Sequence, residues 1–136
     1  MGHISIEEKS VEVQLLFMGD FISDFNPLVG IVHDEATALD ISQKYPEYNI
    51  SWETIAVSDG SQRLEAGAPL WLLVQGGAFT DTAYSHPSPV ALYTSLASAE
   101  AERTVREQKY QEDLLLWKLY LGELDLSAPD WTYRAT

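Results

Sequence analysis

The chain has 136 residues, 46% of them hydrophobic and 21% charged, and its formal net charge at pH 7 is −13. This length and composition predict one globular domain over 1–136, and the absence of cysteine excludes disulfides and thiolate chemistry. The excess of carboxylates excludes binding to nucleic acid through phosphate contacts, because such binding rests on clustered lysine and arginine.

Neither a secretory signal nor a membrane span is expected from the sequence. Glu7 and Glu8 stand where a signal peptide would be apolar. No apolar run approaches the length that crosses a bilayer. Together with the lack of cysteine, these features favour a cytoplasmic protein.

The first half of the chain predicts two strands, a helix and a third strand, over 11–18, 28–33, 35–45 and 48–57. Asp34 stands at the N-cap position of the helix, where its carboxylate can accept hydrogen bonds from free backbone amides. Pro46 ends the helix, because proline cannot donate the next backbone hydrogen bond. Ala38, Ile41 and Tyr45 lie on one face of this helix, which is therefore expected to pack on the strands.

The second half repeats this order, with strands over 70–74, 90–94 and 115–121 and a helix over about 96–111. Ser95 occupies the N-cap position of this helix, and Glu102 and Arg106 are spaced to form an ion pair on its surface. A thin apolar seam at Ala97, Ala101 and Val105 is expected to lie close to the sheet.

The two halves are interpreted as a possible internal repeat over 11–60 and 70–126. The alignment pairs Val29, Ile31 and Ala38 with Val90, Leu92 and Ala99. It also makes Trp52 equivalent to Trp117, which favours a strand for 115–121, a run that periodicity alone leaves open between helix and strand. The alternative is two unrelated hairpin–helix segments.

Both interpretations predict the same fold class. The fold is expected to be α+β, because strands and helices alternate through short loops. The expected arrangement is a mostly antiparallel sheet with helices on one face, and the repeat interpretation predicts that it is built as two tandem ββαβ units.

One imidazole in the sequence lies among carboxylates, where His33 precedes Asp34 and Glu35. In an enzyme, His33 would act as a general base oriented by a carboxylate, and His86 is a further polar candidate in a later loop. Helix capping explains Asp34 without catalysis, and the helix dipole explains Glu35. No catalytic residue is therefore assigned.

Acidic residues near His33 could in principle approach a divalent cation, but Asp20, Asp24 and Asp34 match no EF-hand spacing. Gly76 and Gly77 open into no predicted helix and have no lysine nearby, so a phosphate-binding turn is not expected. The sequence predicts neither a metal site nor a cofactor.

Aromatic side chains are the most suggestive candidates for ligand binding. They are Trp52, Trp71, Tyr93 and Trp117 on predicted strands, with Tyr84 in the loop beside them. If they share one sheet face, they could line a pocket for a cationic or planar ligand. The alternative is that they fill the core or a subunit interface, where tryptophan and tyrosine are enriched.

Charge is unevenly distributed along the chain. Residues 1–60 hold eleven carboxylates and two lysines, a balance of −9, whereas residues 61–136 hold ten carboxylates and six cationic side chains, a balance of −4. The negative field of these charges would attract cationic proteins or ligands to the protein surface. The alternative is that the charge only keeps the protein soluble.

Three functional hypotheses follow. The leading one is a non-enzymatic binding protein, a homodimer, whose acidic surface meets a basic protein partner. The second is a small-molecule binding domain with an aromatic pocket, and the third is a small enzyme using His33 and Asp34. In size, acidity and lack of motifs, the chain is similar to the accessory proteins of phages and mobile gene cassettes.

Overall fold

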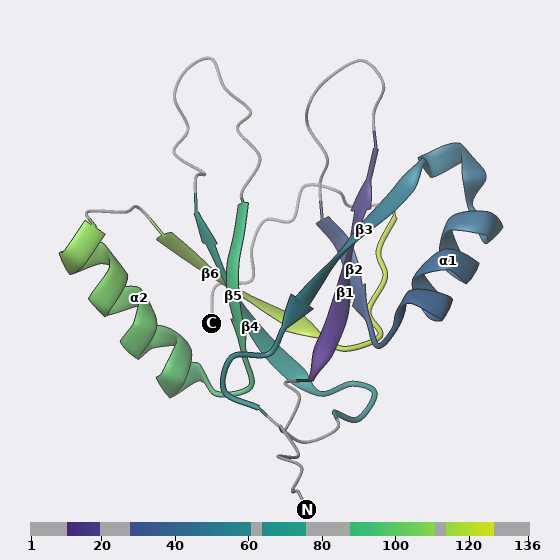
Figure 1. The fold of residues 1–136 in the computed structure, drawn as a ribbon. Helices are drawn as coiled ribbons and strands as arrows, with labels where there is room; N and C mark the ends of the chain where they lie inside the picture. Colours follow the sequence, from purple (N-terminus) through teal and green to yellow (C-terminus); the bar gives the residue numbers. More distant parts are fainter. Residues whose placement is uncertain (1–10, 20–27, 61–63, 76–87, 111–113, 127–136) are drawn as a thin grey trace, which may run out of the picture.

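A computed structural model describes residues 11–19, 28–60, 64–75, 88–110 and 114–126 (Figure 1). The elements in chain order are β1 (Glu12–Met18), β2 (Leu28–Val32), α1 (Glu35–Lys44), the 3-10 helix η1 (Pro46–Tyr48), β3 (Ile50–Ala56), β4 (Pro69–Gln75), β5 (Ser88–Tyr93), α2 (Leu96–Tyr110) and β6 (Leu114–Tyr120). The predicted order of strands and helices is therefore confirmed, including the strand after α2. No helix in the described residues is long and apolar enough to cross a membrane.

The strands form two antiparallel sheets of three strands each. Sheet A has the order β2-β1-β3, and sheet B has the order β5-β4-β6. The α+β class is confirmed, and each sheet carries one helix on one face. The single sheet of the sequence prediction is replaced by two, because the first strand of each half lies between the other two strands of its own half.

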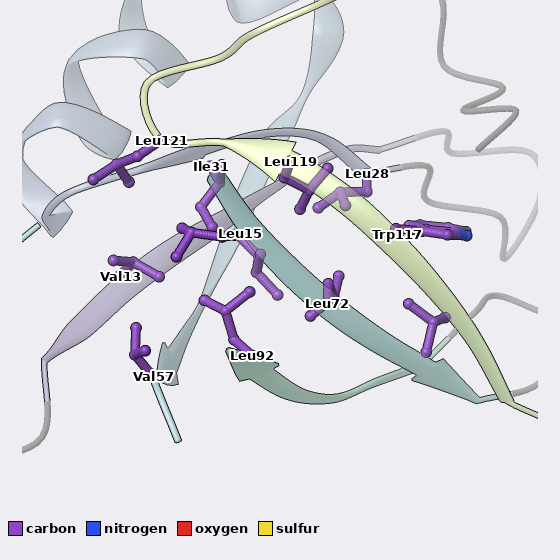
Figure 2. Close-up of a cluster of buried hydrophobic side chains, with 12 residues drawn as sticks. Val13, Leu15, Leu28, Ile31, Val57, Leu72, Leu92, Trp117, Leu119 and Leu121 are labelled. Atoms are coloured by element: carbon purple, nitrogen blue, oxygen red, sulfur yellow. The ribbon is translucent and has the colours of Figure 1, made fainter. Parts of the chain in front are cut away.

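The layers follow the order α1, sheet A, sheet B, α2, with the two helices on opposite sides of the molecule (Figure 1). One cluster of buried side chains lies between the sheets and takes residues from both, including Leu15, Leu72 and Leu92 (Figure 2). Alternation along each strand sends the neighbouring side chains to the outer faces. There Leu16 packs in the cluster under α1 and Leu73 in the cluster under α2.

The two ββαβ units pair their strands in the same register. The corresponding pairs are Leu15–Ile31 with Leu72–Leu92, and Leu16–Gly30 with Leu73–Ala91. In both hairpins the register shifts directly after the second of these pairs, beyond Leu16 in one unit and Leu73 in the other. A β-bulge therefore stands at the same position in each unit. This agreement supports the predicted repeat; a common origin of the halves stays a prediction.

Each unit also contacts the second strand of the other unit where its own third strand ends. Just after β3, the Ser58 N–H donates to the carbonyl of Leu92 in β5 at 2.7 Å. Just after β6, the Gly122 N–H donates to the carbonyl of Ile31 in β2 at 2.7 Å. Leu92 corresponds to Ile31 in the register of the hairpins, so the two contacts are equivalent. Each sheet is therefore connected to the other by a backbone hydrogen bond that starts just after its own third strand.

After this crossing, the chain runs along β2 as an added edge segment. The Ile31 N–H donates to the Glu123 carbonyl, and the Asp125 N–H donates to the Val29 carbonyl. Gly30 lies between them, and a Cβ at this position would collide with the Glu123 carbonyl oxygen. The glycine is therefore explained by the close approach of this segment.

The helices differ in how they meet their sheets. In α1, Ala38 is fully buried and Ile41 and Tyr45 pack beside it, as predicted. In α2, Ala99 is the buried residue, and the predicted seam at Ala97, Ala101 and Val105 is exposed. The seam prediction is wrong because α2 turns Leu96 and Ala99, and not Ala97, Ala101 and Val105, toward sheet B.

Candidate binding surfaces

The candidate aromatic residues lie in three different layers of the molecule. Trp52 packs under α1 on the outer face of sheet A, and Trp117 lies in the cluster between the sheets (Figure 2). Trp71 and Tyr93 lie under α2 on the outer face of sheet B. Tyr84 lies outside the described residues. Trp52, Trp71, Tyr93 and Trp117 therefore do not share one sheet face, and ligand binding by the aromatic residues stays a prediction.

Trp52 and Trp117 are not equivalent, in contrast to the sequence alignment. Trp52 pairs with Leu16 of β1, whereas the corresponding residue of β4, Leu73, pairs with Leu116. Trp117 corresponds instead to Glu53. A shift of one residue along a strand moves a side chain to the other face, which is why one tryptophan faces a helix and the other faces the opposite sheet.

The exposed side of Trp71 is occupied by a cation of the protein itself. Lys118 is paired with Trp71 across β4 and β6, and its Nζ lies 5.5 Å from the Trp71 ring centroid. The same Nζ lies 5.4 Å from the ring centroid of Tyr120. Lys118 thus holds the position between two aromatic rings that a cationic ligand would take.

Tyr93 is buried beside Trp71, and its hydroxyl group faces a polar neighbourhood. Burial raises the pKa of the Tyr93 hydroxyl above its usual 10.0, and the nearby Glu102 carboxylate adds to the rise. A hydrogen bond with Ser58 acts in the opposite direction. Tyr93 therefore stays a neutral hydrogen-bonding group at physiological pH.

The candidate polar site is explained by helix capping. The Thr37 N–H donates to Asp34 Oδ1 at 2.8 Å, which confirms Asp34 as the N-cap of α1. This hydrogen bond lowers the pKa of the Asp34 carboxyl below its usual 3.8. His33, the preceding residue, is half-buried at the end of β2, and His86 lies outside the described residues. The structure therefore gives Asp34 a structural role.

Acidic side chains do not gather into a metal-binding group in the part of the chain that the structure describes. Asp20, Asp24, Gly76 and Gly77 lie outside it.

A junction between the units involves Asp59, a residue that no sequence pattern singles out as functional. Asp59 Oδ1 accepts hydrogen bonds from the Thr94 N–H at 2.7 Å and the Thr94 hydroxyl at 3.2 Å, and Oδ2 accepts one from the Ser95 N–H at 3.1 Å. The Ser95 hydroxyl in turn caps α2 by accepting from the Ser98 N–H. Asp59 of the first unit therefore fixes the start of α2 in the second.

The two units neutralise their charge differently. On α2, Arg106 pairs with Glu102 at 2.9 Å, as predicted, and Arg103 pairs with Glu107 at 3.4 Å. The described part of the first unit contains one cationic side chain, Lys44, whose Nζ lies over the ring of Tyr45 instead of beside a carboxylate.

We define the acidic surface as the exposed carboxylates of the first unit that have no hydrogen-bond or ion-pair partner among the described residues. They are Glu12, Glu35, Asp40, Glu47 and Glu53. Glu12, Glu35, Asp40 and Glu47 lie on the α1 side of the molecule, on β1, α1 and η1. Glu53 of β3 pairs with Leu15 and therefore lies on the other face of sheet A.

Comparison of the chain with protein-family models, with curated proteins and with solved structures finds no match. The candidate surfaces therefore rest on the residues and contacts of this chain alone.

Proposed function

We propose that this protein is a non-enzymatic binding protein whose acidic surface recognises a basic protein partner. The observation that carries the proposal is the contrast between the units. Both arginines of α2 are paired with glutamates, whereas five exposed carboxylates of the first unit have no partner in the described structure.

The physical argument concerns the field of these carboxylates. Unpaired exposed charges of one sign add to a potential that reaches about 8 Å into solution at physiological ionic strength. That potential speeds the approach of a cationic partner and repels nucleic acid and anionic membranes. Glu102 and Glu107 contribute less to such a field, because an arginine lies beside each.

The enzyme alternative has less support. It requires a carboxylate that orients His33, and the Asp34 carboxylate accepts a hydrogen bond from the Thr37 amide. The same residue is sufficiently explained by its contribution to α1.

The test compares two double variants that change net charge equally. Asp40→Asn with Glu47→Gln removes two charges from the acidic surface, and Glu65→Gln with Glu100→Gln removes two exposed charges outside the first unit. An oligolysine peptide serves as the basic probe, and calorimetric titration gives its affinity. We expect the first pair to weaken binding roughly two- to thirtyfold, since exposed ion pairs contribute about 0.2–1 kcal/mol each.

The control pair should leave the affinity nearly unchanged. Equal weakening by the two pairs would show a general charge effect and contradict the proposal. Binding of the wild type that does not weaken as salt is raised would contradict it as well, because screening must reduce an interaction between exposed charges.

A further inference from the structure

The outer face of α2 is uncharged. We use the name outer face for the middle of the exposed side of α2, away from sheet B, which carries Ala97, Ala101, Thr104, Val105 and Gln108. The exposed Glu100 and Lys109 flank it, one at each edge. Val105 is 53% exposed. The four residues that form the two ion pairs lie half-buried on the flanks and toward the sheet.

The equivalent helix in the first unit has the opposite polarity. The register of the hairpins makes Ala99 of α2 correspond to Ala38 of α1, and both are fully buried. With the helices aligned in this way, the sheet-facing Ile41 corresponds to Glu102, and the exposed Asp40 corresponds to Ala101. A surface helix normally turns its apolar stripe to the core and its charges to water. The reversal in α2 therefore indicates that its outer face is covered in the assembled protein.

We propose that the outer face of α2 packs against α2 of a second copy of this chain, in an antiparallel pair about a two-fold axis. The net charge of the chain favours a second copy as the molecule that covers the outer face. Two copies of a chain with a net charge of −13 repel each other and can meet only where a surface is locally neutral. The charged residues of α2 are three glutamates, two arginines and one lysine, so its formal charge is zero. A basic partner would be drawn to the acidic surface instead.

The side chains of the outer face suit this contact. Alanine at 97 and 101 lets two helix axes approach closely, and two-fold symmetry makes both copies contribute the same patch to the contact. The helix has 15 residues and is about 22 Å long. A contact of this length buries less than the about 1,200 Å² of a stable interface, so the dimer is expected to be reversible and dependent on concentration.

This pairing has a consequence for the proposed function, although it does not depend on it. Because α1 and α2 lie on opposite sides of the molecule (Figure 1), a dimer through α2 leaves both acidic surfaces on the outside. Such a dimer presents two equal surfaces and can bind a partner with two basic segments more tightly than one chain can.

Sedimentation velocity over a concentration series tests the proposal with the full chain. The wild type is expected to shift from the mass of one chain to that of two as concentration rises. Val105→Glu should abolish the shift, because it brings one additional carboxylate from each copy into the contact. Leu39→Glu is the matched control, since Leu39 is similarly exposed on α1, at 47%, and should leave the shift intact.

Mixing provides the positive test. Val105→Glu and Val105→Lys should each stay monomeric alone and form a heterodimer when combined, because the two charges then attract. If Val105→Glu fails to fold by circular dichroism, Gln108→Glu and Gln108→Lys repeat the test on the same face. A wild type that stays monomeric at every concentration overturns the proposal. So does a dimer that survives the substitutions on the outer face, or one that Leu39→Glu also dissociates.

Discussion

Asp34 and Asp59 both accept hydrogen bonds from backbone amides at the start of a helix, but they differ in the distance between partners along the chain. Asp34 caps its own helix through Thr37, three residues later, and a local pattern predicts it. Asp59 bonds Thr94 and Ser95, 35 and 36 residues later. Sequence reasoning recognises such a residue as part of a turn and cannot assign its partner, because the partner depends on how the units pack.

Replacing Asp34 should give a loss of stability that depends on pH. The pKa of the folded-state carboxyl lies below its usual 3.8, so the ionised form stabilises the fold above that value. This contribution fades as pH falls through the folded-state pKa. Asp34→Ser keeps an oxygen acceptor but not the charge. Urea unfolding should therefore show wild type exceeding Asp34→Ser near neutral pH and the difference shrinking below 3.8. A difference that is independent of pH would contradict the role of the charge.

Replacing Asp59 should weaken the junction between the units. Asp59→Ala removes three hydrogen bonds to Thr94 and Ser95, and we expect a loss of about 1–2 kcal/mol in the free energy of unfolding. Asp40→Ala is the control, because Asp40 is exposed on α1 and has no hydrogen-bond partner among the described residues. Equal urea midpoints for the two variants would show that the junction does not stabilise the fold.

At the scale of the elements, strand and helix positions follow from the sequence because each depends on local periodicity and caps. The helix over 35–45 is observed as Glu35–Lys44, and the disputed strand over 115–121 as Leu114–Tyr120. Register and rotation depend on contacts between elements. For this reason the sequence alignment is wrong by one residue at Trp117, which corresponds to Glu53 and not to Trp52. The sequence also predicts the wrong face of α2 against sheet B, because the seam at Ala97, Ala101 and Val105 is exposed.

The added segment after β6 gives a prediction at this scale. Gly30→Ala places a methyl group against the Glu123 carbonyl and should displace the segment from β2, with a cost of about 1–3 kcal/mol. The amide of Ile31, which donates to that carbonyl, reports the change directly. Hydrogen exchange at Ile31 should become much faster in the variant, whereas the Leu72 amide in the middle of sheet B should keep its protection. Unchanged protection of Ile31 would show that the segment tolerates the methyl group.

At the scale of the whole molecule, the sequence predicts the fold class but not the number of sheets. The apolar positions of β1 and β4 alternate between two buried faces, and local patterns do not reveal that one of these faces meets the other sheet. Leu15 and Leu72 both lie in that shared cluster (Figure 2). The excess of carboxylates in residues 1–60 is visible in the sequence, and the structure adds that five of them are exposed without a partner among the described residues, four of these on the α1 side.

The central claim is that a basic partner meets the acidic surface of the first unit. Nuclear magnetic resonance of the isotope-labelled chain, titrated with an oligolysine peptide, tests it most directly. The amide signals of α1, η1 and β3 should shift with the peptide, those of α2 should stay in place, and added salt should reverse the shifts. Shifts centred on α2, shifts spread evenly over the two units, or no shifts at low salt would contradict the claim.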